Sequence, residues 1–392
     1  MKSIIVFMFA MLFSVLLTVA QDGYKFNITK ELKATPVKDQ YRSGTCWSFA
    51  GISFLESELL RLNKGEVDLS EMYMVRSGYL HHADLYVRFH GKINFSAGAE
   101  LWDVLNAVKK YGLVTEEAYP GIVPGEKKHV HGEMDEVLKA MLDAVIENKS
   151  KRISPAWKIG YEGLLDAYLG KVPETFVVNG KSFTPLTYSQ SLGLNPDDYV
   201  MITSFNHHPL YSKFVLEAPD NWSMGQVYNV SLDELIEIMK FSIDKGYTVG
   251  WAADVSESGF SWTNGIAIVP EKEMEDLNDL ERAKWSEMTK EEKDALLFHL
   301  NKPGKEKTIT PELRQQAFDN HQTTDDHAMH ITGIAKDQNG TIYFKVKNSW
   351  GSVNAKYDGY LFASESYVRY KTLSILVHKD AVPKAIAKKL GF

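Results

Sequence analysis

Four residues spread along the chain have the side chains that hydrolysis by a thiol requires. Cys46 is a nucleophile, and the 392-residue sequence holds no other cysteine. His327 can carry a proton to a leaving amine, and Asn348 can orient that histidine by accepting from one ring nitrogen. Gln40, six residues before Cys46, can donate its amide hydrogens to a developing oxyanion. Together the four predict acyl transfer through a thioester.

Cys46 is predicted to stand at the start of a helix. A loop with Pro36 and Gly44 precedes it, and apolar residues then recur at three- and four-residue spacing from Trp47 to Leu62. The unpaired N–H groups and the positive dipole end of a helix favour an anion. We therefore expect a lowered thiol pKa at this position.

The histidine and the asparagine are predicted to meet on a hairpin. His327 leads into an alternating run, 329–336, and Asn348 follows another, 341–347, with a turn between the two runs. Antiparallel strands joined by that turn would put both side chains near one end of the hairpin. The alternation also turns His327 and His330 to opposite faces, which argues against a metal pair there.

Three motifs in chain order carry a family resemblance. They are Gln-x5-Cys-Trp-Ser-Phe-Ala at 40–50, Asp-His-Ala-Met-His at 326–330 and Asn-Ser-Trp-Gly at 348–351. They resemble the active-site segments of papain-like cysteine proteases. Segments 68–75, 98–103 and 110–120 further resemble the bleomycin hydrolase and aminopeptidase C branch, which lacks the disulfides of secreted relatives; here Ser43 stands where many of those carry a cysteine.

The resemblance implies a fold, a mechanism and a set of site residues. The fold is α+β, a papain-like pair of lobes, one helical and one β-rich, with large helical insertions. Cys46, His327 and Asn348 would be catalytic, and Gln40 would complete the oxyanion site. Further residues would contact substrate or support the catalytic groups: Gly98, Ala99 and Ala328 for substrate, and Trp47 and Trp350 for support. Gly98 and Ala99 could instead simply begin a helix.

Chain spacing predicts where the insertions lie. The papain-type histidine usually follows its cysteine by roughly 130–150 residues, and His327 lies far beyond that distance from Cys46. We therefore expect one peptidase domain over 21–392, with insertions at about 124–225 and 271–320. The insertions include predicted helices at 133–148, 271–299 and 311–321, and the β-rich lobe includes predicted strands at 248–254, 265–270, 329–336, 341–347 and 359–363.

The first twenty residues predict export. Lys2 precedes an apolar run that ends in Thr18, Val19 and Ala20, as in a secretory signal peptide; a membrane anchor is the alternative. The periplasm or the extracellular space is the expected location, with no stable membrane span after cleavage. The net charge of −7 and the lack of a long basic run disfavour nucleic acid as a partner.

No cofactor or metal is expected. The pairs His81-His82, His129-x-His131 and His207-His208 lack companion ligands at a recognisable metal spacing. Peptides are the expected substrates.

The mode of cleavage stays open at this stage. In the bleomycin hydrolase family the C-terminus enters the cleft of a hexameric assembly, which limits cleavage to substrates with a free N-terminus. Here the basic tail 380–392 does not match the family tail, so a packed helix or an oligomer contact fits equally. An endopeptidase, or a catalytically weak peptide-binding homologue, remains an alternative to an aminopeptidase.

Overall fold

The computed structural model describes residues 23–150, 152–271, 300–353 and 355–392, together with 280, 283 and 287–289. The predicted export signal, 1–20, lies outside the described residues, as does nearly all of the predicted helix 271–299. Among the helices that the structure describes, none is both long and apolar enough to cross a bilayer.

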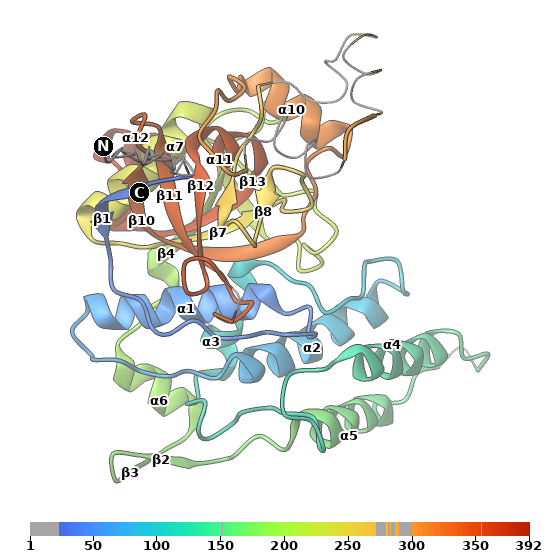
Figure 1. The fold of residues 1–392 in the computed structure, drawn as a ribbon. Helices are drawn as coiled ribbons and strands as arrows, with labels where there is room; N and C mark the ends of the chain where they lie inside the picture. Colours follow the sequence, from blue (N-terminus) through green and yellow to red (C-terminus); the bar gives the residue numbers. More distant parts are fainter. Residues whose placement is uncertain are drawn as a thin grey trace, which may run out of the picture.

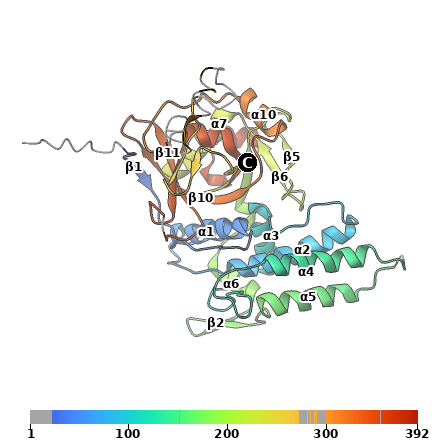
Figure 2. The ribbon, with the colours of Figure 1, turned by 45° about the vertical axis from the view of Figure 1, so that its right-hand side comes forward.

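One lobe is helical, and its core forms around the helix that begins at Cys46. The apolar periodicity after the cysteine produces α1, whose buried residues include Phe54, Leu55 and Leu59. Figure 1 shows α1 between the sheet above it and other helices of this lobe, such as α2, α4, α5 and α6, below it. Figure 2 shows α4 and α5 as a pair on the side away from the sheet. The helices of this lobe are α1 (Cys46–Arg61), α2 (Glu71–Arg88), α3 (Leu101–Tyr111), α4 (Gly132–Ile146), α5 (Ala156–Leu169) and α6 (Pro185–Leu192).

The other lobe is built on one large mixed sheet, and we call it the β-lobe. Its strand order is β5-β6-β4-β13-β7-β10-β11-β12-β9-β8, and β1 pairs with β10. The strands are β1 (Asn27–Glu31), β4 (Tyr199–Thr203), β5 (Lys213–Val215), β6 (Gln226–Asn229), β7 (Val249–Ala253), β8 (Phe260–Ser261), β9 (Ile266–Ala267), β10 (His327–Lys336), β11 (Ile342–Lys347), β12 (Tyr360–Ser364) and β13 (Thr372–His378). A separate hairpin joins β2 (Phe176–Val178) and β3 (Lys181–Phe183).

Helices and a second hydrophobic core complete the β-lobe. Strand residues such as Met329 and Ile331 of β10 pack there against helix residues such as Leu235 and Met239. The helices are α7 (Leu232–Lys245), α10 (Pro311–Asp319), α11 (Glu365–Lys371) and α12 (Lys384–Leu390), with short 3-10 turns at Pro196–Asp198 and Lys379–Ala381.

The α+β, two-lobed prediction is confirmed, and so are its strands. The five predicted strands appear as β7, β9, β10, β11 and β12, and two predicted helices appear as α4 and α10. The segment 124–225 does more than add helices, because β4 within it pairs antiparallel with β13 in the middle of the sheet. That pairing joins segments far apart in the chain, which local periodicity does not reveal.

A buried polar network fixes the helical lobe against the hairpin. Lys347 of β11 donates from Nζ to Ser53 Oγ of α1 at 2.7 Å and to Thr35 Oγ1 at 3.1 Å. The same Ser53 hydroxyl lies 2.9 Å from Nδ1 of His330 on β10. Burial lowers the pKa of Lys347 to about 8. The network connects α1 to β10, which begins at His327, and to β11, which Asn348 directly follows.

Candidate active site

Cys46 is the first residue of α1, and two backbone N–H groups surround its sulfur. They belong to Trp47, in the first turn of the helix, and to Ala328, the residue after His327. The thiol therefore lies where α1 meets the start of β10. The side chain of Cys46 is only partly exposed, and the surrounding protein keeps most water from its sulfur.

His327 and Asn348 meet at the end of the β10–β11 hairpin, where the turn chemistry predicted them. Nε2 of His327 lies 2.7 Å from Oδ1 of Asn348. Since an amide oxygen only accepts, Nε2 carries a proton and Nδ1 is left as the basic nitrogen. The indole of Trp350 lies beside the pair, with its ring 4.7 Å from the imidazole centroid. Both His327 and Asn348 are buried.

Burial controls the protonation of Cys46 and His327. It raises the pKa of the Cys46 thiol to about 12, and the nearby carboxylates of Asp325 and Asp220 contribute to the rise. The lowered thiol pKa expected from the helix N-terminus is therefore wrong for the isolated thiol, because desolvation outweighs the backbone donors. Burial also lowers the pKa of His327 to about 4. Each charge alone is disfavoured, so the thiolate and the imidazolium must form together, by one proton transfer.

Gln40 is held in place by the residue next to Asn348. Its side-chain oxygen accepts from Ser349 Oγ at 2.6 Å, and its backbone N–H donates to the Ser349 carbonyl at 2.8 Å. With Oε1 engaged, the amide presents its Nε2 donors elsewhere, as an oxyanion site requires. Ser349 was not among the predicted site residues, although its position directly after Asn348 is a signal that could have found it.

Ser43, which stands where many relatives carry a cysteine, and Thr45, directly before the nucleophile, are both turned inward. Their hydroxyls lie 2.5 Å apart, and both side chains are buried. The Thr45 carbonyl accepts the Ser48 N–H at 3.0 Å, which starts the helix. The hydroxyl of Thr45 therefore supports the turn before Cys46.

The segment with Gly98 and Ala99 lies beside the cysteine loop. Nε1 of Trp47 donates to the Ala97 carbonyl at 3.0 Å, and Gly98 has its carbonyl engaged by Trp222 Nε1 at 3.0 Å. A Cβ built on Gly98 would collide with the carboxylate of Asp220. Substrate contact by Gly98, Ala99 and Ala328 stays a prediction, and in this structure Asp220 occupies one side of Gly98.

The C-terminal tail is a packed helix. Ile386 and Leu390 of α12 are buried in the β-lobe core, and Lys389 pairs with Glu234 of α7 at 2.8 Å. The Phe392 ring lies 5.2 Å from that of Tyr228 on β6. In the part of the chain that the structure describes, these tail contacts involve none of the predicted site residues. A tail that enters the cleft, which the family resemblance implied as one alternative, is thus not the arrangement of this chain.

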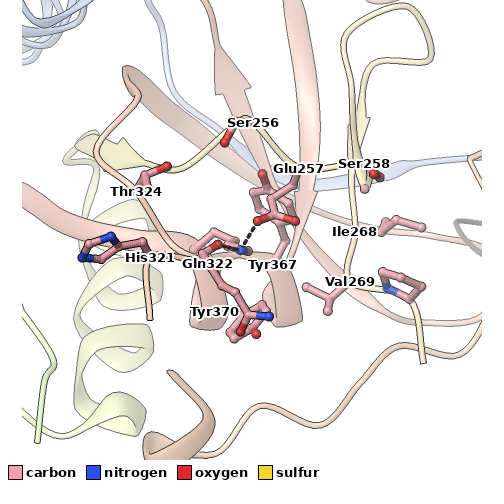
Figure 3. A pocket seen from close by; sticks show the side chains of 13 residues that line it. Ser256, Glu257, Ser258, Ile268, Val269, His321, Gln322, Thr324, Tyr367 and Tyr370 are labelled. Atoms are coloured by element: carbon pink, nitrogen blue, oxygen red, sulfur yellow. Dashed lines mark hydrogen bonds and ion pairs between the residues drawn. The ribbon is translucent and has the colours of Figure 1, made fainter. Parts of the chain in front are cut away.

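The β-lobe has a cavity that is lined by none of the predicted site residues. It has a volume of about 310 Å³, and Ser256, Gln322 and Tyr367 are among its lining residues. Figure 3 shows Glu257 among the side chains that line the cavity, and Glu257 forms an ion pair with Lys371, another lining residue. Lys371 is buried and also donates to the Gln322 carbonyl, so its charge is satisfied within the protein.

Two of the predicted histidine pairs contact neighbouring side chains of the protein. Among the described residues, His207, His208 and Glu217 form the one set of three side chains that could share an ion. His207 Nε2 lies 3.1 Å and His208 Nε2 2.9 Å from the two carboxylate oxygens of Glu217, and His208 stacks on Phe214. The pair His81-His82 packs on Trp222.

Comparison with protein families finds two matching sequence models. Residues 24–154 match the papain family of cysteine proteases, and residues 307–391 match the Peptidase C1-like family. The first match contains Cys46 and the second contains His327 and Asn348, so both halves of the candidate site fall in matched segments.

Comparison with individual proteins extends the similarity to nearly the whole chain. Aminopeptidase C of Listeria innocua is 24% identical over 91% of this chain and 83% of its own length. The mitochondrial cysteine proteinase 1 of Saccharomyces cerevisiae is 23% identical over 94% of this chain and 80% of its own length. The crystal structure of PepW from Lactobacillus rhamnosis HN001 has the same fold, with a TM-score of 0.69 at 18% identity over 93% of this chain and 84% of that one.

Proposed function

Because the chain belongs to the papain-like cysteine peptidases, in the bleomycin hydrolase and aminopeptidase C family, we propose that it is a cysteine aminopeptidase acting through a thioester acyl-enzyme. The observation that carries this proposal is the 2.7 Å contact between His327 Nε2 and Asn348 Oδ1. The His327–Asn348 contact lies next to Ala328, whose backbone N–H acts on the Cys46 sulfur. A nucleophile, a base and the group that orients the base thus meet at one point.

In the proposed mechanism, the proton of Cys46 passes to Nδ1 of His327 as sulfur attacks the scissile carbonyl carbon. The Asn348 oxygen stabilises the imidazolium by accepting from Nε2. The carbonyl oxygen becomes an oxyanion that accepts from Gln40 Nε2 and from the Cys46 backbone N–H. His327 then returns its proton to the leaving amine as the C–N bond breaks. In deacylation it takes a proton from water, which attacks the thioester and releases Cys46.

Replacing Ser349 by alanine should lower kcat about 10-fold and change KM little, because Gln40 loses the hydroxyl that fixes its amide. Ser349→Thr keeps the hydroxyl and should restore most of the rate. Ser352→Ala, at an exposed serine of the same loop, should leave both constants near wild type. An equal loss in Ser349→Thr and Ser349→Ala would mean that the hydroxyl does not orient Gln40.

Aminopeptidase action is favoured over endopeptidase action by the relatives, several of which are named aminopeptidase C or G. The decisive test compares a fluorogenic aminoacyl amide with its Nα-acetylated twin under reducing conditions. We expect the free-amine substrate to be cleaved at least tenfold faster, with Cys46→Ala as the blank. Equal cleavage of both would make the protein an endopeptidase. Turnover of neither, across a panel of peptides, would leave a peptide-binding homologue.

We further propose that the protein is exported and forms a homo-oligomer. The apolar run of the first twenty residues supports export to the periplasm or the extracellular space. The family resemblance supports a homo-oligomer, and specifically a hexamer. N-terminal sequencing of the mature protein tests the first proposal, and light scattering of the purified protein tests the second.

A further inference from the structure

Three buried or half-buried carboxyl groups from separate parts of the chain meet beside Cys46. They are Glu100 at the start of α3, Asp220 in the loop between β5 and β6, and Asp325 just before β10. Asp325 accepts from the backbone N–H of Asp220, and the carboxyl groups of Glu100 and Asp325 share a hydrogen bond. We call these three residues the carboxylate cluster.

The cluster is adjacent to the nucleophile on two sides. Trp47 Nε1 holds the Ala97 carbonyl at 3.0 Å, so the loop that leads to Glu100 runs along the cysteine segment. Asp325 lies two residues before His327, and the backbone of Ala328 contacts the Cys46 sulfur. Asp220 is fixed over Gly98, where Oδ1 accepts from Asn94 Nδ2 at 2.9 Å and from Ser96 Oγ at 3.0 Å.

The negative charge of the cluster has no basic partner among the described residues. Glu100 is only 2% exposed, and apart from the bond that the two carboxyl groups share, neither Glu100 Oε1 nor Asp325 Oδ2 has a hydrogen-bond partner. The groups that act electrostatically on the three are other carboxylates, with no lysine or arginine among them. Buried carboxyl groups without a cation are costly, and repulsion and burial raise the pKa of Glu100 well above its usual range. A bound cation would relieve that cost.

We propose that the carboxylate cluster binds the α-ammonium group of the substrate and so sets the length of peptide that fits on the N-terminal side of the cleaved bond. Half-exposed Asp220 and Asp325 would receive the ammonium hydrogens, with Glu100 behind them. This proposal rests on the proposed function.

Bond geometry supports this assignment. In an N-terminal residue the nitrogen is separated from the attacked carbonyl carbon by Cα alone, a distance of about 2.5 Å. When Cys46 attacks that carbon, the ammonium must lie within a few ångströms of the sulfur, and the charges of Asp220 and Asp325 act on that sulfur. A longer peptide would put its next residue into the space over Gly98 that Asp220 occupies. The cluster would thus replace the restriction that a cleft-blocking C-terminus could have supplied.

Ammonium binding would also help the thiol. The carboxylates of Asp325 and Asp220 disfavour the thiolate of Cys46. A substrate ammonium that neutralises them removes this opposition at the moment when the thiolate is needed. An Nα-acetylated substrate brings no such charge, so it would lose both binding and activation.

The test compares Asp220→Asn and Asp325→Asn with wild type on three fluorogenic amides: alanyl, Nα-acetylalanyl and Nα-acetyl-lysyl-alanyl. We expect kcat/KM for the free alanyl amide to fall about 10- to 100-fold in each variant, the value of one charged contact. The acetylated alanyl amide should change less than threefold. Glu306→Gln, at a half-buried carboxyl group of the β-lobe that accepts from Val269 N–H and Ser364 Oγ, is the matched control and should leave all three rates unchanged.

A second readout separates a charge effect from damage to the fold. Alkylation of Cys46 by iodoacetamide at fixed pH should be several-fold faster in both asparagine variants, because a charge that disfavours the thiolate is removed. An equal fall for free and acetylated substrates, or no change at all, would overturn the proposal. A fall confined to the lysyl-alanyl amide would also overturn it, by assigning the cluster to a basic side chain. Failure of the proposed function is distinguishable in wild type itself, which would then cleave either none of the three substrates or the acetylated amides as fast as the free alanyl amide.

Discussion

Cys46→Ser abolishes hydrolysis, with an expected loss of about 10⁴- to 10⁶-fold in kcat, as for other nucleophile removals. The serine hydroxyl keeps the size and the hydrogen bonds of the thiol. Its pKa is far higher, however, and the buried His327, with its pKa lowered to about 4, is too weak a base to compensate. The structure thus predicts that shape alone does not support catalysis at this position.

The measurement is kcat on a free-amine fluorogenic amide, checked by thermal unfolding of the variant. Ser43→Ala is the matched control, because Ser43 lies in the loop just before Cys46 and its buried hydroxyl contacts Thr45. It should retain activity within a few-fold. Because the sequence has one cysteine, iodoacetamide should add a single label. Wild type should lose activity in proportion to the fraction of protein that is labelled. A labelled protein that remains fully active would refute the assignment.

Arg314→Met should destabilise the fold strongly, by about 3–5 kcal/mol in the free energy of unfolding. Arg314, on α10, is 2% exposed. Its guanidinium donates to the Ser204 carbonyl at 2.7 Å, the Arg369 carbonyl at 3.0 Å and the Tyr370 carbonyl at 3.2 Å, and also to the Thr372 carbonyl. Methionine fills much of the volume but leaves these buried acceptors without donors.

Urea unfolding followed by tryptophan fluorescence gives the change in the free energy of unfolding. Arg152→Met, at an exposed arginine, is the control and should stay within about 0.5 kcal/mol of wild type. Since Arg314 joins α10 to the backbone around α11 and β13, the loss should appear as a lower midpoint of the whole β-lobe. An Arg314→Met midpoint equal to that of Arg152→Met would show that water replaces the guanidinium at no cost.

Much of the catalytic geometry was predictable because it is local in the chain. Helix periodicity after Cys46 and the turn between 329–336 and 341–347 depend on nearby residues, and they place the thiol at a helix start and His327 beside Asn348. The identity and order of the motifs then indicate the fold, since a thiol, a base and an orienting amide in that order are typical of one family.

The thiol pKa, the place of β4 in the sheet and the packing of the tail depend on contacts between distant segments, which the periodicity of the sequence does not reveal. Burial, a property of the whole fold, raises the thiol pKa that the helix end alone would lower. Strand β4 joins the centre of the sheet through β13, and the tail packs on α7.

The sequence by itself determined which groups are proposed to react, because their chemistry and local geometry belong to short segments. Tertiary structure alone decided the electrostatic surroundings of those groups. Glu100, Asp220 and Asp325 are unremarkable acids in three separate segments, and folding brings them together beside Cys46. Charge interactions act through space and strengthen with burial, so their effect exists only once the chain is folded.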